Sequence, residues 1–157
     1  MHICFLTNEF PKEGFPHGGV GTFVSTLGIK LVENGIKVSV IGLNYINQEE
    51  TEIIDGINVF RVVAKKQKGL QWYFNAKAIA AKIKKVHAEN PIDIIETAEL
   101  GLAFLPKIKE IKYVIRLHGG HHFLNPKTKL WKAFQEKKSF SKADAFIAIS
   151  NFVKTQT

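Results

Sequence analysis

Short apolar segments alternate with longer amphipathic segments along the whole chain, and this alternation limits the folds that the chain can adopt. The apolar runs predict strands at residues 2–6, 37–43, 92–96, 113–117 and 143–150, and two β-prone segments within residues 53–63 on either side of a tight turn at Asp55-Gly56. The helical periodicity between them predicts helices at residues 22–33, 72–89, 102–108 and 126–140, with a further helix beginning at Asn151. Strands that alternate with helices form parallel sheets covered on both faces. The sequence therefore predicts a three-layer α/β/α domain with a mostly parallel sheet.

Length and composition fit a single globular domain over residues 1–157. The chain is 45% hydrophobic, and a domain of this length buries ~70% of its unfolded surface. Its only cysteine, Cys4, lies inside the first apolar run, so we expect a buried, inert thiol in a reducing compartment. The first segment is a predicted strand rather than a leader, and no apolar run approaches the ~20 residues of a membrane span. We therefore expect a cytoplasmic location.

The net charge is +8, with 22 lysines and arginines against 14 aspartates and glutamates. Only Arg61 and Arg116 are arginines, whereas surfaces that read bases or clamp phosphates favour the arginine fork. No nucleic-acid motif is present, so nucleic acid is not expected as a partner. Two interpretations remain for the lysines. They solvate the outer faces of the helices, or the lysines of residues 65–68 join the aromatic residues 72–74 in peripheral contact with a membrane surface.

A loop that follows the first predicted strand ends in a glycine cluster, Gly18, Gly19 and Gly21. Glycines can adopt positive φ and allow close approach of a ligand, and a helix that begins near Thr22 offers unpaired N–H groups. This arrangement favours a site for phosphate, pyrophosphate or carboxylate; the alternative is a sharp turn without a ligand. The spacing excludes a Walker loop, because Val20 and Gly21 stand where its lysine and hydroxyl would be. It also disfavours the dinucleotide fingerprint, because Val24 replaces the third glycine.

Two further loops follow predicted strands, at residues 96–101 and 118–122. Because ligands bind outside the carboxyl ends of parallel strands, we expect both loops to share one crevice with residues 8–21. His118 follows its strand directly and precedes two glycines, so we expect its imidazole in the crevice; the alternative is a histidine that caps the strand end. His118, His121 and His122 do not have a recognised zinc spacing, and no metal site is expected.

Six segments, taken together and in this order, resemble the N-terminal domain of family 4 glycosyltransferases. They are Gly18-Gly19-Val20-Gly21, residues 33–38, Asp55-Gly56-Ile57, Asp93-Ile94-Ile95-Glu96, Arg116-Leu117-His118-Gly119 and residues 143–150. The resemblance implies the GT-B architecture, in which two Rossmann-like domains face each other across a cleft. It also implies transfer of a sugar from a nucleotide-sugar donor with retention of configuration. The N-terminal domain receives the acceptor in such enzymes, and the donor-binding C-terminal domain is absent from this chain.

The same resemblance implies the roles of individual residues. Gly18, Gly19, Val20 and Gly21 correspond to the loop near the donor diphosphate and the acceptor. His118 corresponds to a catalytic histidine that contacts the donor sugar or the reacting centre. Asn8, Glu9 and Glu99 are expected on the acceptor side. No Asp-x-Asp triad is present, in agreement with a metal-independent fold, and no cofactor is expected besides the nucleotide-sugar, which is a substrate.

Two functions follow from these observations. The first is the acceptor-side half of a retaining glycosyltransferase, inactive alone, whose acceptor is a saccharide or a lipid-linked glycan and which works in the cytoplasm or at the cytoplasmic membrane face. The second is a stand-alone Rossmann-like module that binds a phosphorylated or anionic ligand without chemistry. A second α/β domain of ~180 residues encoded beyond Thr157 would favour the first.

Overall fold

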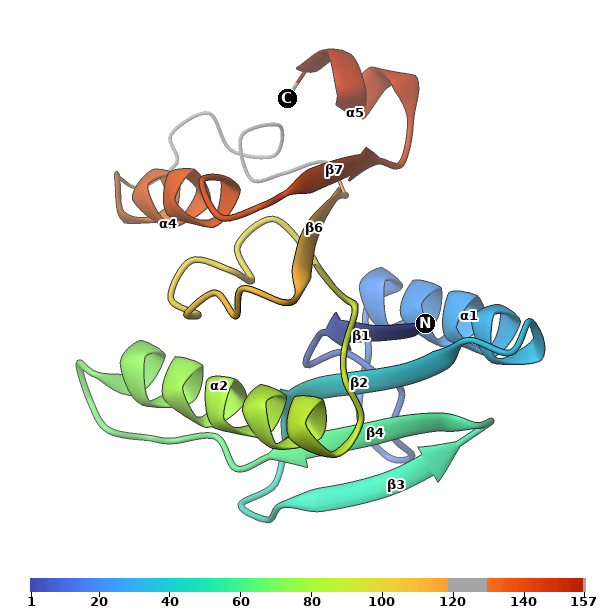
Figure 1. Ribbon diagram of the computed structural model, residues 1–157. Coiled ribbons are helices and arrows are strands. Elements are labelled where there is room, and N and C mark those ends of the chain that lie inside the picture. Colours follow the sequence, from blue (N-terminus) through green and yellow to red (C-terminus); the bar gives the residue numbers. More distant parts are fainter. Residues whose placement is uncertain (119–129, 157) are drawn as a thin grey trace.

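The computed structural model describes residues 1–118 and 130–156, which form a twisted sheet with helices on both of its faces (Figure 1). The strands are β1 (His2–Leu6), β2 (Lys37–Leu43), β3 (Glu50–Ile54), β4 (Ile57–Val62), β5 (Ile94–Thr97), β6 (Lys112–Leu117) and β7 (Ala145–Ala148). The helices are α1 (Gly19–Glu33), α2 (Gln71–Glu89), α4 (Leu130–Phe140) and α5 (Asn151–Gln156). Strands and helices alternate as predicted, except that β2, β3 and β4 follow one another without a helix, as do β5 and β6.

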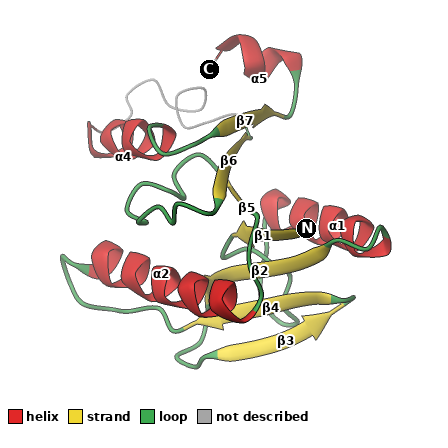
Figure 2. Cartoon of the chain, in the orientation of Figure 1, coloured by secondary structure: helices red, strands yellow, loops and turns green. Residues whose placement is uncertain are grey.

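The strands lie in the order β3-β4-β2-β1-β5-β6-β7. Within the described residues every pairing is parallel except that of β3 with β4. The chain builds the sheet outward from β1 toward β2 and β4, and then returns to the other side of β1 with β5 (Figure 2). The direction of winding therefore changes between β1 and β5, which is where open α/β sheets bind their ligands.

Side chains of successive strand residues pack on opposite faces of the sheet. Phe5 and Val40 belong to the core that α1 covers, whereas Cys4 and Ile41 belong to the core beneath α2 and α4. This alternation confirms the three-layer α/β/α fold (Figure 1). Cys4 is fully buried, and burial raises the pKa of its thiol, which is expected to be inert.

Two turns adopt the geometry that their residues predict. After α1, Gly35 has φ +76°, and the amide of Ile36 donates to the carbonyl of Leu31 at 3.0 Å, as in a Schellman motif. Between β3 and β4, Asp55 and Gly56 have φ of +50° and +81°, the values that a two-residue hairpin turn requires. These turns end α1 and set the register of the one antiparallel pair.

The helix predicted at residues 102–108 is not formed. Residues 102–104 form turns and residues 105–108 have no regular secondary structure. Lys142 Nζ donates to the carbonyls of Leu102 and Ala103 at 3.1 Å and to that of Leu105 at 2.6 Å. Since a distant ammonium group satisfies these acceptors, helical hydrogen bonds are not needed. The start of the helix predicted at residues 126–140 lies partly outside the described residues, and α4 begins at Leu130.

None of the described helices combines the length and the apolar character that crossing a bilayer requires.

His2 joins β1 to its neighbours through a buried imidazole. Its Nε2 lies 2.8 Å from Ser39 Oγ on β2, and its Nδ1 lies 3.2 Å from the carbonyl oxygens of Asn90 and Pro91. Burial lowers the pKa of His2 below its usual value, because the charged form loses its hydration. His2 therefore binds a proton less readily in the folded chain than in the unfolded chain.

We predict that the free energy of unfolding decreases as the pH falls from about 7 to about 5, because acid favours the state that binds the additional proton. His2→Gln should reduce this decrease, as measured by urea denaturation at several pH values. His17→Gln, in an exposed loop, is the control and should retain it. An equal pH dependence in His2→Gln and the unchanged protein would show that His2 is not responsible.

Candidate functional site

A cavity of about 420 Å³ lies at the carboxyl ends of β1 and β5. Its wall comes from β1 and the loop after it, from β5 and the loop after it, from the first turns of α2, and from a few residues of α1, β2 and α4. The polar lining residues are Thr7, Asn8, Glu9, Asn75, Thr97, Glu99 and Glu136, and the apolar ones include Val20, Ile79, Leu100 and Phe104. The cavity thus occupies the position that the change in winding direction predicts.

The loop after β1 is fixed by hydrogen bonds to distant strands. The amide of Leu43 at the end of β2 donates to Asn8 Oδ1 at 2.7 Å. Arg61 of β4 donates from Nη2 to the carbonyl of Pro11 at 2.9 Å. The amide of Glu9 donates to Thr7 Oγ1 at 3.1 Å. Asn8 therefore lines the cavity but uses its side-chain oxygen to hold the loop in place.

The glycine cluster allows α1 to approach the loop after β1 closely, and it does not adopt unusual backbone angles. The expected positive φ is wrong for Gly18, Gly19 and Gly21, none of which has it. A Cβ built on Gly21 would lie 1.7 Å from the carbonyl oxygen of Glu9, and one on Gly18 would lie 2.3 Å from Glu9 Oε2. A Cβ on Gly19 would meet no atom within 4 Å. The missing side chains thus let the start of α1 pack against Glu9.

The predicted helix start near Thr22 is three residues late, because α1 already begins at Gly19. No side chain caps Gly18, and the first turn of α1 contains no acidic residue. The amides of this turn have no partner within the helix, and the helix dipole is positive here. The carboxylate of Glu9 lies beside Gly18, so a negative charge of the chain itself already occupies one side of the helix end. The open space is beside Gly19.

His118 follows β6 at the rim of the cavity and is half-buried. Its backbone amide donates to Glu99 Oε1 at 2.6 Å. Its ring meets that of Phe23 edge to face, with 5.8 Å between centroids. With Val20 and Thr97 it lines a small hollow that shares a wall with the main cavity. The structure thus brings His118 and Glu99 into direct contact, although they are nineteen positions apart in sequence.

A largely buried ion pair supports this end of the sheet. Arg116 of β6 donates to both carboxylate oxygens of Glu96 of β5, at 2.6 Å from Nε and 3.1 Å from Nη2. The guanidinium carbon lies 4.6 Å from the centroid of Phe23, the ring that His118 touches. Sequence reasoning assigned neither charge a role. The available signal was a charged residue near the carboxyl end of each of two mainly apolar strands, Glu96 and Arg116, since such charges are seldom buried unless they are paired.

The predicted site residues separate into three groups. Asn8, Glu9, Val20 and Glu99 line the cavity, and His118 lines the adjoining hollow. Gly18, Gly19 and Gly21 do not line the cavity. His121 and His122 lie outside the described residues. Within residues 1–118 and 130–156, no three histidine, cysteine, aspartate or glutamate side chains are close enough to hold a metal ion.

The contributions of α2 and α4 to the cavity were not predicted from the sequence. Asn75 and Glu136 reach the cavity from helices that are far from the glycine loop in sequence. Together with Asn8, Glu9 and Glu99 they give the cavity lining two amides and three carboxylates among apolar side chains. Such groups accept hydrogen bonds from hydroxyls while the apolar wall packs against carbon. The cavity is therefore suited to a polyhydroxylated ligand.

Comparisons with known proteins agree with this architecture. The sequence matches the family described as Glycosyltransferase Family 4 over residues 17–157. Among 21 solved chains that match, sucrose-phosphate synthase from Thermosynechococcus elongatus superposes with a TM-score of 0.63 at 14% identity, covering 99% of this chain and 80% of that one. No curated protein sequence matches significantly. The structural likeness confirms a Rossmann-like fold.

We predict opposite effects of alanine at two neighbouring glycines. Gly21→Ala should lower the free energy of unfolding by roughly 1–3 kcal/mol, because its methyl group would overlap the Glu9 carbonyl. Gly19→Ala, the matched control, should change it by less than about 1 kcal/mol, since its side chain enters open space. Urea denaturation of both variants measures the difference. Equal free energies of unfolding for the two variants would mean that α1 can move away from Glu9 without loss of stability.

Proposed function

Because the chain belongs to glycosyltransferase family 4, we propose that it is the acceptor-side domain of a retaining enzyme that transfers a sugar from a nucleotide-sugar. The acceptor is a saccharide or a lipid-linked glycan. The observation that supports this proposal most directly is the contact of His118 with Glu99 at the rim of a cavity lined by hydrogen-bond acceptors. That contact joins the residue expected at the reacting centre to one expected at the acceptor.

The cavity receives the acceptor. Three carboxylates, from Glu9, Glu99 and Glu136, accept hydrogen bonds from its hydroxyl groups. Glu99 uses one oxygen to hold the His118 amide, which places its carboxylate between the cavity and the reacting centre. An acceptor bound here presents a hydroxyl toward His118, and such positioning removes much of the entropic cost of reaction.

The donor lies between this domain and a second Rossmann-like domain. Its diphosphate approaches the start of α1, where Gly19 leaves open space and the helix dipole favours negative charge. Glu9 beside Gly18 repels a second anion, so the diphosphate binds on the Gly19 side or displaces the Glu9 carboxylate. The transfer requires no metal or further cofactor, and the enzyme works in the cytoplasm.

His118 positions the donor sugar. Its backbone is fixed by Glu99, and its ring is held against Phe23, which rests on the Arg116 guanidinium. Among the described residues the imidazole nitrogens have no hydrogen-bond partner, so packing orients the ring. It interacts with the sugar as charge develops at the anomeric carbon, an electrostatic role rather than that of a nucleophile.

We predict that His118→Ala in the complete enzyme lowers kcat roughly 10²–10³-fold, the usual effect of removing one such interaction, ~2.7–4 kcal/mol. Folding should be unaffected, because the bond to Glu99 uses the backbone amide. His118→Gln keeps a polar group and should recover part of the rate. Steady-state kinetics measure both variants. A His118→Ala enzyme with unchanged kcat/KM would contradict the proposed role, as would a glycosyl adduct trapped on His118.

Residues 1–157 alone should transfer no sugar and bind a nucleotide-sugar only weakly. Useful affinity requires that most of a small ligand be enclosed, and this domain supplies one wall of the cleft. Titration calorimetry of the isolated chain, with the complete enzyme as the comparison, measures this. Micromolar binding by residues 1–157 would argue instead for a module that binds its ligand unaided.

A further inference from the structure

A group of large apolar side chains is exposed where α2 and α4 begin. Leu70, Trp72, Tyr73, Trp131 and Phe134 have exposed fractions between 40% and 53%. Trp131 connects the two helices, because its ring lies 6.0 Å from that of Trp72 and 5.6 Å from that of Phe134. We call these five residues the aromatic patch. Its members come from separate segments and form one continuous surface.

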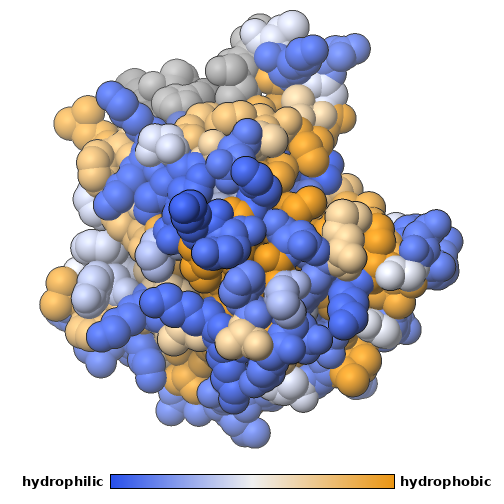
Figure 3. All heavy atoms as spheres, in the orientation of Figure 1, coloured by the Kyte–Doolittle hydropathy of each residue, from blue (hydrophilic) through white to orange (hydrophobic). Residues whose placement is uncertain are grey.

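The aromatic patch is too apolar to be explained by folding alone. Trp72 packs one side against Phe104 at 4.3 Å between centroids, yet 40% of its surface stays in water. Leu130, next to Trp131, is 91% exposed. Hydrophobic side chains accordingly reach the surface along the left margin of the space-filling view, beside hydrophilic ones (Figure 3). A contiguous apolar surface of this kind indicates a partner that covers it.

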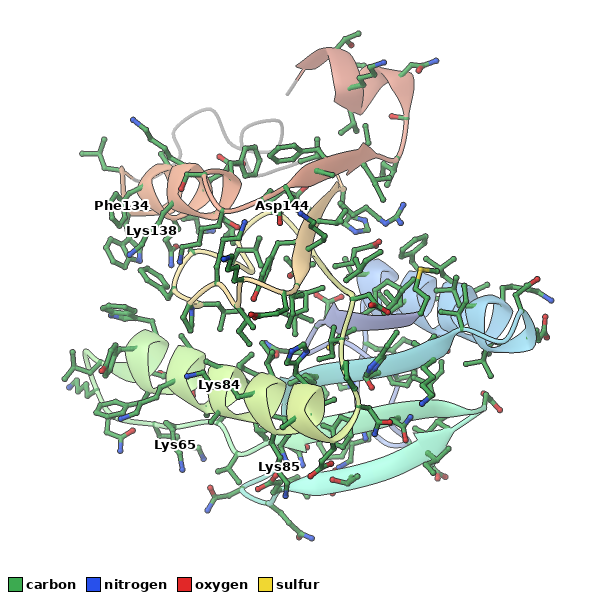
Figure 4. All side chains as sticks on the ribbon, viewed as in Figure 1. Lys65, Lys84, Lys85, Phe134, Lys138 and Asp144 are labelled. Carbon is green, nitrogen blue, oxygen red and sulfur yellow. The ribbon has the colours of Figure 1, made fainter. Side chains whose placement is uncertain are left out.

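The charge around the aromatic patch is positive. Residues 64–77 and 130–138 together contain seven lysines and one glutamate. Lys138 Nζ lies 5.0 Å from the centroid of Phe104 and 5.8 Å from that of Phe134 (Figure 4). Lys66, Lys68 and Lys77 are exposed beside the α2 portion of the patch. The covering partner therefore carries negative charge as well as apolar surface.

We propose that the aromatic patch docks the protein on an anionic lipid surface. Tryptophan and tyrosine are enriched where headgroups meet acyl chains, and lysines nearby add attraction to anionic headgroups. A protein partner fits less well, because lysine is depleted in protein interfaces. For this part of the surface we adopt membrane contact, the second of the two interpretations of the lysines.

The orientation that docking imposes is specific. α2 and α4 both begin on the side of the sheet where β4 and β6 end, and the cavity opens on that side. Phe104 touches the aromatic patch through Trp72 and also lines the cavity. Docking would bring the cavity mouth close to the headgroups, where a lipid-linked acceptor is found. This last step rests on the proposed function, whereas the docking itself does not.

The test is sedimentation of the complete enzyme with vesicles of phosphatidylcholine alone or mixed with phosphatidylglycerol. Binding should require phosphatidylglycerol and weaken with added salt. Lys66→Glu with Lys68→Glu should weaken it roughly tenfold or more. Trp131→Ser with Phe134→Ser should weaken it by a similar factor. The four changes are on exposed side chains, so the variants should remain folded, which circular dichroism verifies.

Matched controls lie on other parts of the molecule. Lys37→Glu with Lys109→Glu makes the same change in charge near the amino ends of the strands, and Ile53→Ser removes an apolar side chain that is 74% exposed on β3. Both controls should bind vesicles as the unchanged enzyme does. The proposal would be overturned by absence of binding to either vesicle, by equal losses in the controls, or by a dimer that the aromatic-patch variants dissociate. Because the readout is binding, its failure would leave the proposed sugar transfer untouched.

Discussion

The pairing of β1 with β5 is the interaction on which the rest of the structure depends. It joins the two halves of the sheet through four residue pairs, from Ile3 with Ile94 to Leu6 with Thr97, and the Thr97 hydroxyl adds a hydrogen bond to the Leu6 carbonyl. The loops that leave these two strands form opposite walls of the cavity. A shift of this pairing by one residue would invert the side chains of β5 and separate those walls.

The two arginines of the chain act inside the fold, whereas the lysines are mainly outside it. Arg61 pairs with Glu52 and holds the loop after β1, while Arg116 pairs with Glu96 and supports Phe23 under His118. A planar guanidinium can bond two partners at once with fixed geometry, which an ammonium group does less well. Removing Arg116 would leave the buried Glu96 carboxylate without its partner near the site. The two side chains that form the most directional charged hydrogen bonds thus hold the residues around the site in position.

Local patterns were sufficient for the fold but only partly for the site. Apolar runs and helical periodicity predicted the sheet, and the turn at Asp55 and Gly56 followed from backbone preference alone. The helix predicted at residues 102–108 was wrong because Lys142, far away in sequence, bonds the carbonyls of that segment. The glycine loop was located correctly, but Gly18 and Gly21 serve close contact with Glu9 rather than positive φ. Asn75 and Glu136 were missed because only tertiary packing brings them to the cavity, while the family resemblance was confirmed by the match over residues 17–157.

The central position of β1 also affects how the domain folds during synthesis. Leu6 and Thr97, which meet in the sheet, are 91 positions apart. A ribosome adds about 5–20 residues per second, so roughly 5–18 s pass between the synthesis of the two partners. β2 can pair with β1 during this interval, but the other edge of β1 exposes unpaired backbone groups next to apolar side chains. The strand that organises the finished domain is therefore the one that most needs protection while the chain is being made.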